Sequence, residues 1–175
     1  MSQTLLIRSK CHQQLHLENK TLKCENNHCY DISKRGYINL LLNPDKATNN
    51  PGDSKESLVA RKAYLNKGYY DPILNQVITC IDEFKHQDDL SILDLGCGEG
   101  YYTQGLKKHF ENSDIYGLDI SKIAIDMATR YRKDVTWLVG NSKNIPILDH
   151  SLDFICALFT VVNQDELKRA LKEDG

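Results

Sequence analysis

The stretch Ser91–Tyr101 reads SILDLGCGEGY, a short apolar run that leads directly into a turn containing three glycines. An apolar run of this length, bounded by a turn, is typical of a strand buried on both faces of a parallel sheet. Glycines at 96, 98 and 100 allow the backbone to approach a ligand where a Cβ atom would collide with it. A helix beginning at Tyr101 would point its positive end at the same place. The stretch therefore predicts a ligand-binding turn between a strand and a helix.

The rest of the chain after this turn alternates between strand and helix patterns. Further strands are predicted at 114–119, 135–139 and 154–159. Helices are predicted at 101–110, 122–131 and 165–172. Alternation of this kind implies a parallel sheet with right-handed crossovers. We therefore predict an α/β domain over residues 87–175 that contains four parallel strands.

Asp119 ends the second predicted strand, 21 residues after Gly98. A carboxylate at this position can accept hydrogen bonds from both hydroxyls of a ribose. The alternative is that Asp119 only caps the helix that follows. Together, the glycine turn and Asp119 predict a nucleoside-binding site at the carboxyl ends of the strands.

Residues 1–42 and 43–86 differ from this domain in their pattern. The first region has short apolar pieces typical of a small sheet with tight turns, namely Leu5–Ile7, Thr21–Cys24, Tyr30–Ile32 and Tyr37–Leu42. Such a sheet buries little apolar area and needs a staple or a neighbour. Residues 43–53 predict a loop, followed by a helix capped by Asp53 or Ser54 and by a second helix capped by Asp71. The buried sides of these helices are predicted to carry Leu58, Ala63, Leu65, Ile73, Val77, Ile81 and Phe84.

Composition places the chain among globular proteins. It has 175 residues, 41% of them hydrophobic and 26% charged, and a net charge of −2. Its N-terminus has no apolar core long enough for a secretory signal, so we expect a cytoplasmic protein without membrane contact and without disulfides. Cys80 and Cys156 are expected to be small buried hydrophobes. Residues 1–44 hold six basic and three acidic side chains, whereas residues 86–175 hold ten and fifteen, so the two ends predict different partners.

The glycine turn, read together with GLDIS at 117–121 and NIPILDHSLDFI at 144–155, resembles the class I S-adenosylmethionine-dependent methyltransferases. The alternative is a NAD or plain nucleotide site on a similar Rossmann-like fold. Upstream, PGDSKES and ARKAYLNKGYYDPI, together with LKCENNHCYDISKRGYINLL at 22–41, narrow the resemblance to the bacterial 23S rRNA (guanine-N1-)-methyltransferases. These enzymes have an N-terminal zinc-ribbon-like module. The resemblance therefore implies a module at 1–42, a two-helix linker at 43–86 and a methyltransferase domain at 87–175.

The resemblance implies specific residues for S-adenosylmethionine. Those around its methionine part would be Asp94, Gly96, Cys97, Gly98, Gly100 and Tyr101. Asp119 would hold the ribose, Ile120 would lie against the adenine, and Asn141 and Ser142 would reach its edge. The alternative for Asn141 is an ordinary turn residue. No catalytic base is assigned, and Thr160 and Asn163 are the polar candidates after the fourth strand.

The family's zinc module has C-x2-C followed by C-x3-H. In this chain Cys24 and His28 match the second pair and Cys11 matches the second member of the first pair. Arg8 stands where the first ligand would fall, and four ligands are normal for structural zinc. Cys29, His12 or His16 are candidates for the fourth ligand. The alternative is a module that folds without metal.

RNA contacts are predicted from the basic N-terminal region. The residues concerned are Lys10, Lys20, Lys23, Lys34 and Arg35, with Tyr30 and Tyr37 between them. The alternative is a solvated basic surface with tyrosines in the core. Arg61 and Lys62 are interpreted as a solvated helix face.

The function implied by the resemblance is methyl transfer to N1 of a guanine in a 23S rRNA hairpin. The sheet of such enzymes has more strands than the four predicted, so we expect the chain to be truncated at its C-terminus. An inactive fragment that binds cofactor or RNA is therefore one alternative, and a small-molecule methyltransferase is another. The N-terminal module argues against the small-molecule alternative. A homodimer is a further prediction for this chain.

Overall fold

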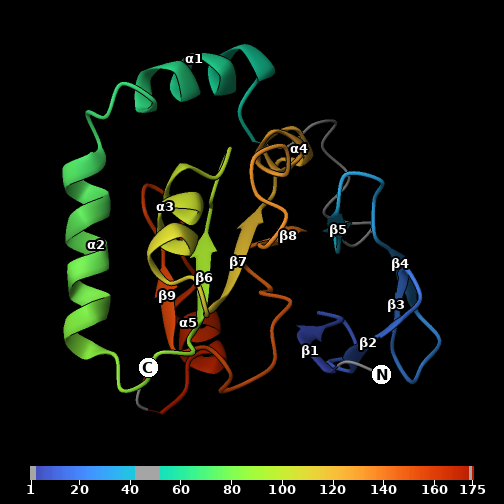
Figure 1. The fold of residues 1–175 in the computed structure, drawn as a ribbon. Helices are drawn as coiled ribbons and strands as arrows, with labels where there is room; N and C mark the ends of the chain where they lie inside the picture. Colours follow the sequence, from blue (N-terminus) through green and yellow to red (C-terminus); the bar gives the residue numbers. More distant parts are fainter. Residues whose placement is uncertain (1–2, 42–51, 174) are drawn as a thin grey trace.

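A computed structural model of the chain describes residues 3–41, 52–173 and 175. Its first four strands form an antiparallel sheet in sequential order. They are β1 (Gln3–Ile7), β2 (Gln14–Glu18), β3 (Thr21–Lys23) and β4 (Cys29–Asp31). The sequence analysis did not identify β2, whose partly buried alternation is weak. This small sheet lies beside a larger parallel sheet (Figure 1).

The larger sheet has five parallel strands in the order β5-β8-β7-β6-β9. They are β5 (Tyr37–Asn39), β6 (Ser91–Leu95), β7 (Asp114–Asp119), β8 (Thr136–Val139) and β9 (Phe154–Cys156). The predicted α/β class is confirmed. The fourth predicted strand is shorter than expected, because the strand pairing ends at Cys156.

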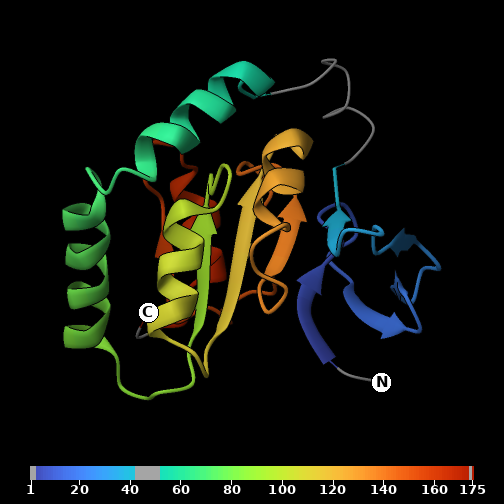
Figure 2. The same ribbon diagram turned by 45° about the horizontal axis from the view of Figure 1, so that its top comes forward.

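In the described part of the chain, five helices lie around the parallel sheet. They are α1 (Lys55–Leu65), α2 (Asp71–Phe84), α3 (Tyr101–His109), α4 (Lys122–Ala128) and α5 (Gln164–Ala170). Helices α3 and α4 cover one face and α5 covers the other, while α1 crosses above the carboxyl ends of the strands (Figures 1 and 2). The Ser54 hydroxyl caps α1 by accepting from the Ser57 N–H at 3.2 Å, as expected for a serine N-cap.

One strand pairs differently from its prediction. Tyr37–Leu42 was expected in the small N-terminal sheet, but β5 pairs in parallel with β8, with Tyr37 opposite Trp137 and Asn39 opposite Val139. The physical reason is that the outer edge of β8 would otherwise leave a row of backbone groups unpaired. The expected loop at 43–53, and with it the expected boundary after residue 42, falls mostly on residues 42–51, which lie outside the described part of the chain.

The small sheet and the parallel sheet share one apolar core. Buried leucines of the small sheet pack in the same cluster as buried leucines of β6, β7 and β8; they are Leu6, Leu15 and Leu22 on one side, and Leu93, Leu118 and Leu138 on the other. Strand β1 also bonds to the segment that precedes β9. The Ile7 N–H donates to the Pro146 carbonyl at 3.1 Å, and the Leu148 N–H donates to the Leu5 carbonyl at 2.8 Å. The small sheet is therefore docked through both its backbone and its side chains.

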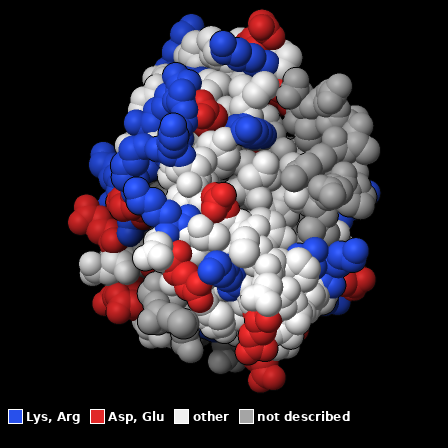
Figure 3. Space-filling model, turned by 90° about the vertical axis from the view of Figure 1, so that its right-hand side faces the viewer, with Lys and Arg blue, Asp and Glu red and all other residues white. Residues whose placement is uncertain are grey.

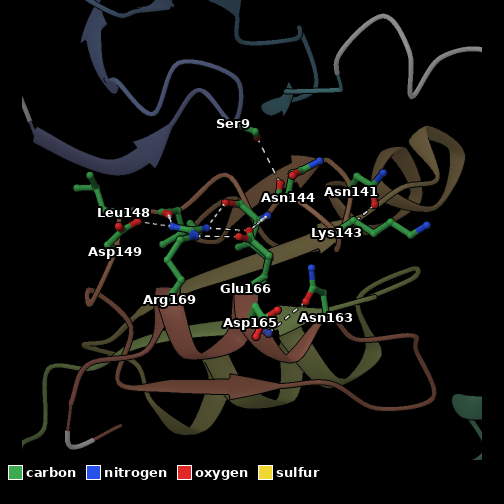
Figure 4. A network of polar contacts seen from close by, with 12 residues as sticks. Ser9, Asn141, Lys143, Asn144, Leu148, Asp149, Asn163, Asp165, Glu166 and Arg169 are labelled. Carbon is green, nitrogen blue, oxygen red and sulfur yellow. Dashed lines mark hydrogen bonds and ion pairs between the residues drawn. The ribbon is translucent and has the colours of Figure 1, made fainter.

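Arg169 on α5 holds the segment to which β1 is bonded. Its guanidinium donates to the Ile145 and Ile147 carbonyls, each at 2.8 Å, and pairs with Glu166 at 2.9 Å and Asp149 at 2.6 Å (Figure 4). The same segment begins at Asn141, so one arginine ties together α5, the segment after β8 and the docked small sheet.

Several side chains of α1 and α2 are more exposed than predicted. Cys80 and Phe84 are exposed, Ile73 is 36% exposed, and Ala63 of α1 is also exposed. Ile73, Cys80 and Phe84 are exposed because they border a cavity that no other described element fills. Between α2 and β9 lies an apolar cavity of about 750 Å³. Asp71 does not cap α2, which has Tyr70 at that position.

Candidate cofactor and metal sites

The glycine turn has the backbone that only glycine adopts easily. Gly96, Gly98 and Gly100 have φ angles of 76°, 56° and 85°, all in the left-handed region. A Cβ atom on Gly96 would lie 2.5 Å from the Thr160 hydroxyl oxygen, and one on Gly100 would lie 2.6 Å from the Trp137 ring. At Gly98 the nearest atom would be the Arg61 guanidinium, 3.7 Å away. Two of the glycines thus permit packing inside the protein, and Gly98 leaves open space beside Arg61.

Asp119 connects the glycine turn to α4. One carboxylate oxygen accepts from the Gly98 N–H at 2.9 Å, and the other accepts from the Ser121 N–H at 2.7 Å. Burial raises the pKa of Asp119, although these two backbone donors oppose the shift. Asp119 therefore fits both interpretations of its role. It bonds to the start of α4, as a helix-capping carboxylate does, and it also lies at the edge of a cavity, as a ribose acceptor would.

Asp94 lies in the buried part of β6, one residue before the strand ends, and is 2% exposed. Burial raises its pKa to about 6, against a hydrogen bond of 2.5 Å that the Thr103 hydroxyl donates to it. The nearby carboxylates of Asp119 and Glu99 raise the pKa further. A buried acid of this kind favours a cationic ligand, because a positive charge would stabilise its ionised form.

Two cavities meet at the glycine turn. The larger, about 230 Å³, is lined by Asp94, Gly96, Cys97, Gly98 and Tyr101, together with residues that sequence reasoning did not single out. The smaller, about 90 Å³, is lined by Asp119, Ile120, Asn141, Ser142 and Thr160, together with Gly96. Gly96 belongs to both. The structure thus brings nine of the ten predicted cofactor residues to two adjoining cavities at the carboxyl ends of the strands, and Gly100 packs on Trp137 instead.

Some predicted residues have a local role as well. The Tyr101 hydroxyl donates to Asp71 at the start of α2, and the Asn141 side chain accepts from the Lys143 N–H at 3.0 Å. Asn163 caps α5: its side-chain oxygen accepts from the Asp165 N–H at 3.1 Å, so this side chain has a structural role (Figure 4). Thr160 therefore remains the better placed of the two polar candidates.

The sequence analysis missed the side of the larger cavity that α1 and the start of α2 provide. These residues are Arg61, Tyr64, Leu65 and Tyr70, with Tyr102 of α3 and Leu158 and Phe159 after β9. Arg61 was interpreted as part of a solvated face, but it lines the cavity and pairs with Asp53. The sequence feature that could have indicated this side of the cavity was the frequency of tyrosines, at 64, 69, 70, 101 and 102.

Cys11, Cys24 and His28 come together in the small sheet. Their ligand atoms all lie within 4.8 Å of one another, and the Cys24 sulfur is 3.3 Å from His28 Nδ1. Two thiols and one imidazole are ligands that suit zinc. Cys29, exposed and directed at the Asn27 carbonyl, does not join them, and neither do His12 and His16. Within residues 3–41 and 52–173, the cluster thus has three ligands of the four that structural zinc normally takes.

Arg8 occupies the position of the absent ligand. Its carbonyl accepts from the Cys11 and His12 N–H groups at 3.2 and 2.9 Å, which closes a tight turn of the kind that brings two ligands together. Its side chain, however, donates to the Tyr30 hydroxyl at 3.1 Å. A zinc ion held here would have Cys11, Cys24 and His28 as protein ligands and a structural role, remote from the glycine turn.

The basic residues of the N-terminal region are arranged differently from the prediction. Tyr37 is buried in β5, and Tyr30 is tied to Arg8, so the expectation that Tyr37 stacks on RNA is wrong. Arg35 instead contacts α4 and the segment after it: Arg35 pairs with Asp126 at 2.8 Å, and Lys133 donates to the Arg35 carbonyl at 3.4 Å. On the side of the molecule shown in Figure 3, lysine and arginine side chains gather in a band along the left of the view.

The fold is that of the class I S-adenosylmethionine-dependent methyltransferases. Residues 92–174 match the model of a family described as a methyltransferase domain, and residues 10–47 match the one described as "RlmA, N-terminal", a zinc ribbon. A solved S-adenosyl-L-methionine-dependent methyltransferase from Methanococcus maripaludis has the same fold. It aligns with a TM-score of 0.58 at 23% identity, over 71% of this chain and 63% of that one.

The chain is similar over most of its length to proteins named 23S rRNA (guanine-N1)-methyltransferases. A Bacillus subtilis (strain 168) protein that carries this name is 32% identical over 89% of the chain and 56% of its own length. The Streptomyces fradiae 23S rRNA (guanine(748)-N(1))-methyltransferase is 28% identical over 94% of the chain and 59% of its own length. The chain thus spans somewhat more than half the length of these relatives. Among the described residues, no helix is both long and apolar enough to cross a membrane.

Proposed function

We propose that this chain binds S-adenosylmethionine at the glycine turn and contributes to methyl transfer onto N1 of a guanine in a 23S rRNA hairpin. The observation that carries the proposal is the pair of cavities that meet at Gly96. The smaller, bordered by Asp119 and Asn141, suits the adenosine half of the cofactor. The larger, bordered by Asp94 and open to Phe159, suits the methionine half and the acceptor.

The side chains at these cavities have matching chemistry. Asp94 and Glu99 are buried carboxylates beside the larger cavity, and they favour the positive charges of an ammonium and a sulfonium group. Asp119 now accepts from two backbone N–H groups, and its oxygens lie where ribose hydroxyls could share them. Thr160, packed on Gly96, separates the two halves.

The chemistry needs alignment more than it needs acid or base strength. S-adenosylmethionine, when bound, supplies an electrophilic methyl group. Guanine N1 forms the new N–C bond as the C–S bond breaks, and the N1 proton passes to solvent water. Holding the acceptor in line with the methyl group supplies much of the rate enhancement in such a reaction. The residues of this chain therefore act mainly by binding and orienting the two reactants.

An RNA partner is supported by charge. Arg35 and Arg130 both pair with Asp126, and Lys133 donates to the Arg35 carbonyl, so these three cations form a short basic band. Such a band fits the phosphates of a hairpin. An rRNA substrate would also place the protein in the cytoplasm. The homodimer stays a prediction.

The proposal is tested first by cofactor binding. Isothermal calorimetry with S-adenosylmethionine should give binding for the wild type, and Asp119→Ala should weaken it by on the order of tenfold or more, because a charged acceptor is lost. Asp114→Ala removes an exposed carboxylate from the other end of β7 and should leave affinity unchanged. A wild-type protein that does not bind at millimolar cofactor would contradict the proposal.

The second test is methyl transfer. Tritiated methyl groups should be incorporated into an RNA hairpin with the loop around guanine 748 of 23S rRNA, and primer extension should stop at an N1-methylated guanine. Cofactor binding without transfer would instead identify an inactive cofactor-binding fragment. Transfer to a small molecule with no transfer to RNA would identify the other alternative.

A further inference from the structure

An aromatic cluster borders the larger cavity. Tyr64 and Tyr70 lie with ring centroids 6.0 Å apart, and Tyr70 and Phe159 also lie 6.0 Å apart, both edge to face at 72°. Tyr69 extends the cluster, 5.0 Å from Tyr64. Three separate segments, the end of α1, the start of α2 and the residues after β9, thus bring their rings to one place.

Phe159 is unusual within this cluster. Its side chain is 79% exposed, and its φ angle of 56° lies in the left-handed region, which is a strained conformation for a bulky residue. A backbone held in this conformation keeps a large apolar ring in water, where it adds nothing to the core. Strain of this kind is often found where a residue contacts a ligand.

The cluster lies next to the reactive end of the proposed cofactor site. Phe159, Tyr64 and Tyr70 line the same cavity as Asp94 and Gly98. Thr160, the neighbour of Phe159 in the chain, packs against Gly96 and lines the adjoining cavity. A flat ring stacked on Phe159 would therefore sit between solvent and the glycine turn.

We propose that Phe159, supported by Tyr70 and Tyr64, is the platform that stacks on the unpaired acceptor base. This inference rests on the proposed function and adds the residues that receive the base. Aromatic side chains bind extruded bases by stacking on their faces. Tyr70 meets the Phe159 ring edge to face and Tyr64 in turn contacts Tyr70, while Arg61, paired with Asp53, lines the same cavity.

A fluorescent reporter tests stacking without turnover. Phe159→Trp, saturated with S-adenosylhomocysteine, should lose emission on titration with the guanine 748 hairpin, because guanine quenches a stacked indole. The same hairpin with an abasic site in place of that guanine should not quench it. Phe84→Trp is the matched control, since Phe84 is also exposed but lies on α2 outside this cavity, and it should not respond. The wild-type Trp137 is buried and gives a constant background.

Affinity and transfer give a second readout. Phe159→Ala should raise the Kd for the hairpin by about tenfold or more, as removal of a stacking ring does. Phe159→Tyr should restore it, and S-adenosylmethionine affinity should be unchanged in both. A wild-type protein that methylates the hairpin while Phe159→Ala methylates it equally well would overturn the platform and leave the proposed function standing.

Three further outcomes would also support or overturn the Phe159 platform. A wild-type protein that transfers no methyl group, while the Phe159→Trp emission is quenched only by the guanine hairpin, would support the platform and overturn the proposed function. Blue-shifted emission of Phe159→Trp before RNA is added would mean that protein covers the ring, and would overturn the platform. A hairpin that binds without quenching would do the same.

Discussion

At one edge of the parallel sheet, β5 pairs with β8 and the small antiparallel sheet packs beyond it. At the opposite edge, β9 and α2 border an open apolar cavity. Leu6, Leu15 and Ile38 at the first edge are buried, whereas Ile73 and Phe84 at the second are exposed. Both edges have apolar side chains in their sequence, so their hydrophobicity alone does not tell which will be buried. The difference comes from whether another element of the described chain covers them.

The largest contrast between the edges should appear in stability. Leu15→Ala at the covered edge should lower the free energy of unfolding by about 2–5 kcal/mol, because it leaves a cavity in a packed core. Ile73→Ala removes a similar aliphatic side chain from α2 and should cost less than about 1 kcal/mol. Urea unfolding of both variants measures this, and equal losses would show that the open edge is as well packed as the covered one.

The middle of the sheet should behave differently from either edge. Asp94 has a folded pKa of about 6 against an ordinary value of 3.8, so between these values the folded protein holds a proton that the unfolded chain has released. Stability from this group is therefore lost as pH rises through 6, by roughly 3 kcal/mol at most. Asp94→Asn removes that cost while its amide oxygen can still accept from Thr103.

We expect Asp94→Asn to be more stable than wild type at pH 7.5 and equal to it near pH 4, with weaker S-adenosylmethionine binding at pH 7.5. Thermal unfolding across this pH range, with calorimetry for the ligand, checks both parts. A constant stability difference at all pH values would mean that burial of the charge is not its source.

The covered edge can be strengthened at its metal cluster. Arg8→Cys places a thiol three residues before Cys11 and would complete four zinc ligands, so zinc affinity should rise by on the order of 100-fold, or about 2.7 kcal/mol. Arg8→Ala, which also breaks the bond to Tyr30 but adds no ligand, is the control. Competition with a chromophoric chelator measures the affinity, and equal values for the two variants would mean that position 8 does not face the cluster.

The smallest change is expected at the open edge. Phe84→Ser should alter the free energy of unfolding by less than about 0.5 kcal/mol, because the ring is 67% exposed. Urea unfolding of the variant and the wild type measures this difference in the free energy of unfolding. A loss of 2 kcal/mol or more would show that Phe84 is covered in solution and that the two edges are more alike than the structure indicates.

The glycine turn and the strand–helix alternation after it were predictable, because each depends on residues close together in the sequence. The resemblance to a zinc module predicted Cys11, Cys24 and His28, and the structure brings these three side chains together. The pairing of β5 was not, since a three-residue strand can pair with any open edge nearby. Arg61 and the tyrosines at the larger cavity were missed because they reach it only through the path of α1 across the sheet.

The sequence by itself determined the class of fold and the position of the glycine turn, through backbone requirements that only glycine meets and through apolar runs of strand length. Only the tertiary structure decided which edge of the sheet is covered and which aromatic rings meet beside the turn. Local pattern predicts which segments form helices and strands because apolar periodicity, capping residues and turn residues are local features of the sequence. Burial and convergence depend on contacts between segments far apart in the chain, such as Tyr70 with Phe159 and Leu5 with Leu148.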